Sequence, residues 1–422
     1  MEFLIRAAEI LHPDSPLHKS TKDVLISNGK IHRIADRIEF DGQVISADGL
    51  KLSIGWFDMR AHYNDPGFEH KEDIDSGTRT ALSGGFTDVA LLPNTNPVVN
   101  TKNGVSYYQK HNKLSPVNLH PIAAVTIDCQ GKELTEMIDL HHAGAIAFSD
   151  GLKTIWHTDI LLKALQYLQK FDGLLINRPE DQHLTAFGHM NEGQVSTVLG
   201  LKGMPALSES VMIQRDLKLL DYAGGKIHFS LVSTKESVEL IKAAKADGLK
   251  VTCDVGVNYL KFTEQDLEDY DTNLKVNPPY RLEEDRQALI EAVLDGTIDA
   301  VVSDHNPHDE EGKKLEFDLA DFGSANQQSF YSVISAILGD KLDQVMSNFT
   351  SNPREILGIE VPKIEEGADA CLTLFSPKKH WTFNSQTNNS KSVASPVFGN
   401  TLEGVVIGTI NKGELHLNNY ED

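Results

Sequence analysis

The sequence predicts an α/β protein whose main part is a (β/α)8 TIM barrel, with a small β-sandwich domain formed by both termini. Two observations lead to this prediction. Short apolar strands alternate with helical stretches through the middle of the chain, and β-rich segments lie at both ends. Strand–helix alternation over about 300 residues produces a parallel sheet, and a closed barrel is a common form of such a sheet. A doubly wound open sheet is the alternative.

The two ends of the chain have similar patterns. Residues 24–31 form a run of β-forming residues that includes an Asn28-Gly29 pair, which suits a tight hairpin turn. Near the other end, 370–375 and 404–410 are strand-like runs bounded by Gly and Pro. We therefore expect the termini to meet in one β-rich domain.

The middle of the chain supplies the strands and helices of the expected barrel. Its strand candidates are 87–92, 145–148, 173–176, 226–232, 250–255 and 300–303. Helices with apolar residues at helical spacing are expected over 234–246 and 283–294. The predicted boundaries are 54–361 for the barrel, and 1–53 with 362–422 for the β-rich domain. The Asn/Ser-rich stretch 384–392 is typical of a surface loop.

The net charge and the cysteine content limit the partners and the cellular compartment that we expect. The formal net charge is −22, so we expect neither nucleic acid nor a membrane as partner, because no basic surplus exists to neutralise phosphates. The three cysteines are widely spaced, and favour a reducing cytoplasm over a disulfide framework. The first residues show no signal-peptide pattern. No apolar stretch approaches the roughly 20 residues that span a bilayer.

Polar clusters follow several of the predicted strands. They lie at 58–62, 93–97, 148–151, 177–181 and 303–308. In a barrel of this kind the functional residues lie where strands end. A single polar loop after a strand is more often structural, but all of these clusters would converge on one mouth of the barrel.

The run 55–67 carries a family resemblance. It resembles the dihydroorotase signature, in which a strand ends in His-x-His, followed by an Arg and a Pro-Gly pair. Further blocks similar to those of the family follow in order at 71–77, 84–87, 93–97, 277–281, 304–308 and 367–370. The resemblance implies a barrel with a β-rich domain from both termini, and a homo-oligomer. Active members use zinc, held by His and Asp, to activate the water that opens a cyclic amide.

Several site positions of the family are retained in this sequence. By the resemblance, His62, Asp150 and Asp304 are the remnants of the metal site, and Asp304 also holds the general acid/base position. Asn94 and His308 match positions that bind substrate. These residues are the candidate site, and the resemblance gives them their roles.

Other site positions are replaced. Arg60 stands at the first His of His-x-His, and Arg178 and Leu231 stand at two further ligand positions. Asn64 replaces the Arg that holds the substrate carboxylate. Arginine stays protonated and leucine has no donor atom, so neither can bind zinc. We therefore expect hydrolysis by the family mechanism to be lost.

Two arginines at ligand positions suggest a substitute for the metal charge. We expect Arg60 and Arg178 to neutralise Asp304, together with Asp58 and Asp150, because buried unpaired carboxylates cost several kcal/mol. The alternative is that both arginines point into solvent.

Three functions remain open from the sequence. The first is a dihydroorotase-family pseudoenzyme of pyrimidine biosynthesis that acts as a non-catalytic partner of aspartate carbamoyltransferase, without a cofactor. The alternative is an active dihydroorotase or related cyclic amide hydrolase, converting dihydroorotate to N-carbamoyl-aspartate with zinc in a reduced metal site. The third is a protein that binds an acidic ligand between Arg60 and Arg178.

Overall fold

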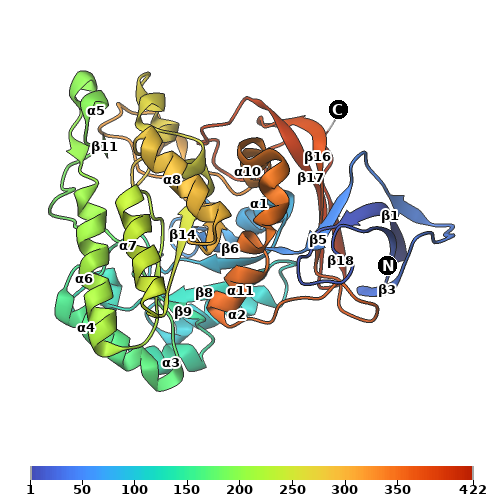
Figure 1. Cartoon of the computed structure of the whole chain (residues 1–422), viewed down its shortest axis with the longest axis horizontal. Helices are drawn as coiled ribbons and strands as arrows, with labels where there is room; N and C mark the ends of the chain where they lie inside the picture. Colours follow the sequence, from blue (N-terminus) through green and yellow to red (C-terminus); the bar gives the residue numbers. More distant parts are fainter. Residues whose placement is uncertain (1, 421–422) are drawn as a thin grey trace.

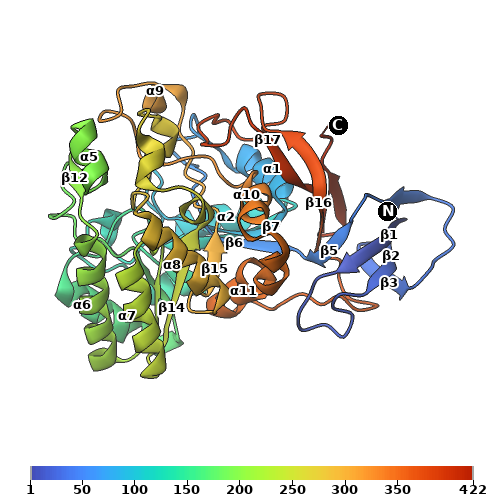
Figure 2. The same ribbon diagram turned by 45° about the horizontal axis from the view of Figure 1, so that its top comes forward.

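A computed structural model of the chain describes residues 2–420. It consists of a barrel surrounded by helices, with a β-rich part at one side that contains the N-terminal strands (Figure 1). The view in Figure 2 shows the same division, with helices α6, α7 and α8 on the barrel and strands β1, β2 and β3 at the opposite side of the picture. No helix within the described residues is both long and apolar enough to cross a membrane.

The barrel contains eight parallel strands, as predicted. They are β6 (Trp56–Ala61), β7 (Phe86–Leu91), β8 (Asn118–Ala123), β9 (Ala147–Phe148), β10 (Leu175–Asn177), β13 (Ile227–Phe229), β14 (Val251–Gly256) and β15 (Ala300–Val302), and they pair in sequence order. The first and last strands meet beyond their ends, where the His62 amide donates to the His305 carbonyl at 2.8 Å. This contact closes the barrel and excludes the open sheet.

Helices cover the outside of the barrel. The longer ones are α1 (Ile74–Gly84), α2 (Lys102–Asn112), α4 (Thr158–Leu168), α6 (Leu207–Ala223), α7 (Lys235–Ala246), α8 (Glu283–Leu294) and α10 (Phe330–Leu338). Shorter ones are α3 (Met137–His142), α5 (Gln194–Leu199), α9 (Glu310–Lys313) and α11 (Ser351–Leu357). In α4 the buried residues Ile160, Ala164 and Leu168 recur at helical spacing, which gives the helix one apolar face. The two predicted helices correspond to α7 and α8.

The β-rich part is one continuous hydrogen-bonded sheet built from both ends of the chain. Its strands are β1 (Glu2–Ile10), β2 (Thr21–Ser27), β3 (Lys30–Ala35), β4 (Gln43–Ile45), β5 (Lys51–Ile54), β16 (Leu372–Thr382), β17 (Thr401–Asn411) and β18 (Glu414–Leu417). The predicted hairpin is present, with positive φ at Asn28 (52°) and Gly29 (74°) between β2 and β3.

The change from one sheet to the other falls at Gly55, between β5 and β6. A side chain at Gly55 would collide with Thr87, because its Cβ would lie 2.1 Å from the Thr87 Oγ1. The next residue, Trp56, is fully buried and contacts the rings of Phe375 from β16 and Tyr331 from α10 at centroid distances of 5.4 and 5.5 Å. This aromatic contact joins the barrel to the terminal sheet.

The stretch 384–392 is a loop at the surface, as predicted, with Ser385, Gln386 and Lys391 exposed, but part of it is held against the barrel. This stretch belongs to a longer segment between β16 and β17, residues 384–400, which we call the strap. Within it, Asn389 donates to Ser83 at 2.9 Å, and Ser392 is buried and donates to the His308 carbonyl at 2.6 Å. Its polar side chains therefore serve contacts to the barrel, which the composition of the stretch does not reveal.

Candidate functional site

The centre of the barrel mouth contains an ion pair between Arg60 and Asp304. Arg60 is at the end of β6, and Asp304 follows β15. The Arg60 Nε lies 3.1 Å from the Asp304 Oδ1, and the two side chains are 3% and 13% exposed. Burial raises the pKa of Asp304 to about 6, and the neighbouring Arg60 opposes that rise. The predicted neutralisation of Asp304 by Arg60 is therefore present.

Arg60 also contacts a buried polar network at β13 and β14. Its guanidinium donates to the Ser230 Oγ at 3.3 Å, and Ser230 donates to Asp254 at 3.0 Å. His228 contacts the same Asp254 oxygen at 2.9 Å. Ser230 and Asp254 were missed at the sequence level, although an acidic residue inside the apolar run 250–255 is a usable signal.

Arg178 has a different partner from the one predicted. It is 8% exposed, and its guanidinium pairs with Glu180 and donates to the Asn277 carbonyl at 3.3 Å. Its Nε is buried without a hydrogen-bond partner. Both arginines are thus buried, so the alternative in which they point into solvent is wrong. Arg178 balances Glu180, two positions along its own loop.

Asp58 and Asp150 are satisfied by neutral groups. The Asp58 carboxylate accepts from the Ser303 hydroxyl and from Gln327 Nε2, the latter at 2.7 Å. Asp150 accepts from the backbone amide and the hydroxyl of Thr126 at 2.9 and 2.5 Å. Burial raises the pKa of Asp150 to about 6, against these hydrogen bonds. The expectation that arginines neutralise these two carboxylates is therefore wrong.

His62 and Asn94 lie side by side. His62 Nε2 is 3.1 Å from the Asn94 carbonyl, and its Nδ1 is 3.2 Å from Asn306 Oδ1, so both ring nitrogens have protein partners. Burial lowers the pKa of His62 to about 4. The Asn94 side chain bonds to the backbone of Asp150 and Leu152 at 2.9 and 2.8 Å. The polar groups of both side chains are thus committed within the protein.

The other two substrate positions, His308 and Asn64, make hydrogen bonds to the loop after β15. His308 contacts the Phe322 carbonyl at 2.9 Å through Nε2, and Lys71 and Asp321 at 3.1 Å through Nδ1. Asn64 is 3% exposed and donates to the Pro307 carbonyl at 3.3 Å. Each residue therefore helps to hold the loop after β15.

Two tyrosines missed at the sequence level fill the space beside Asp304. Tyr259 and Tyr280 are 3% and 1% exposed, with ring centroids 5.1 Å apart. Tyr259 donates to the Pro278 carbonyl at 2.7 Å. Gly256, at the end of β14, makes room for this packing, since a Cβ there would lie 2.7 Å from the Tyr259 ring and 3.3 Å from the Asp304 Cβ.

The residues around the mouth do not form a metal centre. Among residues 2–420, no group of three or more His, Cys, Asp or Glu side chains could hold a metal ion. His62 and Asp150 are hydrogen-bonded to Asn94 and Thr126, and Asp304 pairs with the Arg60 guanidinium. Leu231, buried at 1% exposure, offers no donor atom. The described donor set therefore does not fit zinc.

The room beside Arg178 is small. The cavity lined by Arg178, Glu180 and Asn277 measures about 10 Å³. A space of that size holds at most one water molecule. This cavity therefore gives no room for an organic acid beside Arg178; Arg60 does not line it, so the hypothesis of an acidic ligand between the two arginines stays a prediction.

Backbone strain coincides with the site positions. Asn64, Leu231 and Asp304 have positive φ of 61°, 61° and 49°. Such conformations cost about 1–3 kcal/mol each and concentrate at functional sites, where surrounding contacts hold them. At Leu231 that contact is the backbone amide, which donates to Asp254 Oδ1 at 2.7 Å. The backbone thus keeps a special shape where the resemblance places a metal ligand.

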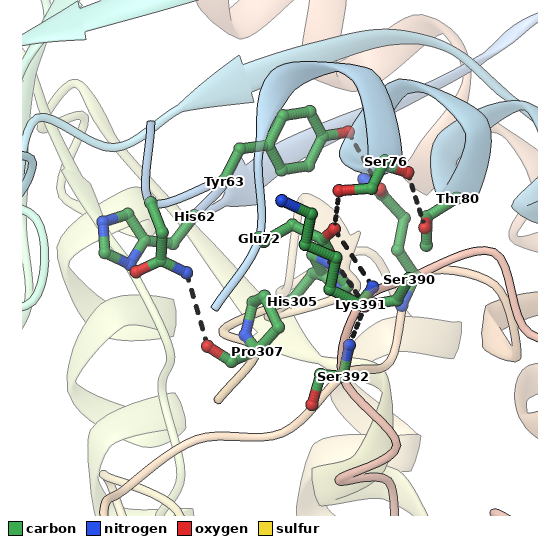
Figure 3. Close-up of polar contacts among 12 residues, drawn as sticks. His62, Tyr63, Glu72, Ser76, Thr80, His305, Pro307, Ser390, Lys391 and Ser392 are labelled. Carbon is green, nitrogen blue, oxygen red and sulfur yellow. Dashed lines mark hydrogen bonds and ion pairs between the residues drawn. The ribbon is translucent and has the colours of Figure 1, made fainter. Parts of the chain in front are cut away.

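A buried carboxylate, Glu72, holds the strap over the barrel. Figure 3 shows Glu72 between Ser76 of α1 and the strap residues Ser390 and Lys391. It accepts from the hydroxyls of Ser76 and Ser390 and from the Lys391 amide, the last at 3.3 Å. His305 Nε2 lies 3.5 Å away, and both side chains are fully buried. One carboxylate therefore joins α1, the strap and the loop after β15.

Comparisons with known proteins agree with this fold. The family model described as "Dihydro-orotase-like" matches residues 50–237, and that described as "Amidohydrolase family" matches residues 188–415. Among solved structures, the L-hydantoinase (dihydropyrimidinase) of Arthrobacter aurescens has a TM-score of 0.84, with 21% identity over 99% of this chain and 96% of that one. The dihydropyrimidinase of Brevibacillus agri NCHU1002 has a TM-score of 0.82, with 21% identity over 99% and 95%.

Curated relatives are more similar in sequence. The protein named dihydroorotase from Syntrophus aciditrophicus is 37% identical over 98% of this chain and 99% of its own length. That from Caldanaerobacter subterraneus subsp. tengcongensis is 40% identical, over 93% and 92%. The barrel and its composite β-rich part are thus those of an amidohydrolase. Within that class, the chain belongs to the dihydroorotase family.

Proposed function

We propose that this chain is a dihydroorotase-family protein that has lost zinc-dependent hydrolysis and serves pyrimidine biosynthesis as a non-catalytic partner of aspartate carbamoyltransferase. The observation that carries the loss is the Arg60–Asp304 pair, 3.1 Å apart in the barrel mouth. A guanidinium has no lone pair, and its fixed charge opposes the approach of a cation. The retained acid/base position is therefore committed to a salt bridge.

A partner role requires an exposed surface that the partner protein can cover. Along α6, Leu207, Val211 and Tyr222 are 54%, 38% and 79% exposed, and helical spacing places them on one face. The neighbouring segment exposes Phe187 at 85% and Val198 at 79%. A helix face with several exposed apolar residues is typical of a protein interaction site. We propose this face, the α6 face, as the partner surface.

The second candidate is an active dihydroorotase. The names of the curated relatives, which are 37% and 40% identical to this chain, favour it over the first candidate. It would turn over dihydroorotate with zinc at a reduced site that includes His62, Asp150 and Asp304. This candidate requires the Arg60–Asp304 pair to open, since the pair occupies the retained Asp304 carboxylate.

Metal analysis with a turnover assay separates the two. The full chain is dialysed against zinc, its bound metal is measured, and both the hydrolysis of dihydroorotate to N-carbamoyl-aspartate and the reverse ring closure, which releases water, are followed. We expect far less than one zinc per chain and no turnover above that of an Asp304→Asn variant. Stoichiometric zinc with turnover that Asp304→Asn abolishes would refute the loss of hydrolysis and establish the second candidate.

The partner role has its own test. We expect the chain to co-purify with aspartate carbamoyltransferase from the same organism, and Val211→Asp with Phe187→Asp to abolish the complex. Leu114→Asp is the matched control, because Leu114 is 91% exposed but lies outside the α6 face. Absence of a complex with the unmodified chain, or equal loss in the control, would refute this partnership.

A further inference from the structure

A large cavity lies away from the barrel mouth, between the β-rich part and the end of the barrel chain. It measures about 660 Å³, and its lining includes His12, Leu17, Ile34, Glu355 and Val361. Residues 12–17 follow β1, whereas Glu355 belongs to α11 and 361–366 lead on towards β16. Small-molecule sites commonly have volumes of about 300–1,000 Å³ and lie where two domains meet.

The lining contains a buried imidazole that lacks a partner. His12 is 6% exposed, and its Nδ1 is buried without a hydrogen-bond partner. Within residues 2–420 the His12 ring makes no hydrogen bond and no ion pair. Buried polar groups nearly always have partners, and the Nε2 of His12 also has none but, unlike Nδ1, keeps accessible surface, so Nε2 is the atom that a ligand in the cavity can reach. Burial lowers the pKa of His12, which keeps the ring neutral, with one donor and one acceptor nitrogen.

The remaining walls are apolar or charged. Leu17, Ile34, Val361 and Ile364 form apolar surface in the cavity. An apolar wall with a few polar groups favours a ligand that has an apolar body and few polar atoms.

The cavity lining contains more acidic side chains than lysines. Lys22 pairs with Asp36 at 2.5 Å, and Lys363 lies 3.9 Å from Glu365, so both lysines have acidic neighbours. In the described part of the chain, the side chains of Asp14 and Glu355 have no ion pair or hydrogen bond, and both line the cavity. An anion would meet two unpaired carboxylates here, whereas a cation would pair with them.

We propose that this cavity binds a small organic cation, an amine carried on a flat apolar body, with the amine towards Asp14 and Glu355 and the body against Leu17 and Val361. A polar atom of the ligand meets His12. The site is separate from the barrel mouth and does not depend on whether the mouth hydrolyses a substrate. Since its walls come from both parts of the chain, the bound ligand would hold the two parts together.

Two probes with the same ring and opposite charge test the proposal. Tryptamine and indole-3-acetate are titrated into the full chain, with heat and thermal unfolding as readouts. We expect tryptamine to bind saturably and raise the Tm, and indole-3-acetate to bind at least about tenfold more weakly, because it meets the carboxylates. Equal affinity for the two probes, or no saturable binding of tryptamine, would overturn the proposal.

Variants place the binding in this cavity. Glu355→Gln is expected to weaken tryptamine about threefold to fivefold, as for a solvent-exposed charge pair. His12→Phe is expected to weaken it about fivefold, through loss of one hydrogen bond. Glu239→Gln, on the exposed surface of α7, is the matched control and should have no effect. Unchanged affinity in a folded Glu355→Gln would overturn the proposal even if His12→Phe fails to fold.

Discussion

Arg60 and Asp304 are 244 positions apart in the sequence and pair at 3.1 Å inside the barrel mouth. Arg60 ends the first barrel strand and Asp304 follows the last one, so their salt bridge crosses the seam at which the barrel closes. A positive charge is thereby fixed beside the carboxylate that the family resemblance assigns to acid/base chemistry. The ion pair connects barrel closure with the proposed loss of zinc.

Removing the arginine should destabilise the fold. In Arg60→Ala the Asp304 carboxylate stays buried without its cation, and removing one partner of a buried pair costs about 3–5 kcal/mol. We expect a loss of about 3 kcal/mol in the free energy of unfolding at pH 8, measured by urea denaturation. The loss should shrink at pH 5, where Asp304 takes up a proton.

The control for this variant is Arg286→Ala. Arg286 pairs with Glu283 at 2.6 Å, but the Glu283 side chain is 57% exposed, so we expect less than about 1 kcal/mol. A double variant, Arg60→Leu with Asp304→Leu, should recover much of the stability because it removes both buried charges. Equal losses in Arg60→Ala and Arg286→Ala would show that the pair does not stabilise the barrel.

Restoring imidazoles should restore metal binding. The variant Arg60→His, Arg178→His, Leu231→His replaces two cations and one alkyl group by zinc donors near His62 and Asp304. We expect it to retain about one zinc or more per chain after dialysis, measured by elemental analysis. A matched variant with glutamine at the same three positions should retain none. Zinc retention by the unmodified chain at the level of the histidine variant would contradict the proposed loss.

The strap should loosen when Glu72 is removed. Glu72→Ala deletes the acceptor of Ser390 and of the Lys391 amide, so we expect trypsin to cut after Lys391 roughly tenfold faster, as for a locally opened segment. Cleavage is followed by mass spectrometry under native conditions. Glu69→Ala is the control, because Lys391 contacts only the backbone carbonyl of that residue, at 2.7 Å. No difference between the two variants would mean that Glu72 does not hold the strap.

A buried carboxyl on α6 should make stability depend on pH. Burial raises the pKa of Asp216 from 3.8 to about 6, against the effects of Arg215 and Asn177. The folded state therefore binds more protons than the unfolded state between these values, so this group's contribution to stability falls as pH rises from about 4 to 6. The total change is on the order of 2–3 kcal/mol.

The variant Asp216→Asn isolates this contribution. The difference in unfolding free energy, unmodified chain minus variant, should decline between pH 4 and 6 and stay level above pH 7. Chemical denaturation at several pH values measures it. A difference that rises with pH, or does not change, would contradict the raised pKa.

Much of the fold follows from local patterns. The hairpin at Asn28-Gly29 is predictable because that pair adopts positive φ without large strain, and the structure has 52° and 74° there. Helix α7 is predictable from its apolar spacing. The strap was not predictable, because an Asn/Ser-rich run has the same composition whether it faces water or donates to a buried carboxylate such as Glu72.

Some features of the candidate site also follow from the sequence, and others depend on the tertiary structure. The positions of His62, Asp150 and Asp304 at strand ends follow from the order of strands and polar clusters. The partner of Arg178 does not, because Glu180 and Asp304 are both acidic and only the direction of the side chain selects between them. Tyr259 was missed because its position at the mouth depends on the missing side chain of Gly256.

By itself, the sequence determined the barrel class and the composite terminal sheet, because strand and helix patterns predict them, and its resemblance to the dihydroorotase family implied that Arg60, Arg178 and Leu231 stand at ligand positions. The tertiary structure alone decided which carboxylates those arginines meet, how the strap is held and where His12 lacks a partner. The physical reason is that burial and hydrogen bonding depend on chain segments that lie far apart in sequence, such as Arg60 and Asp304 at a separation of 244.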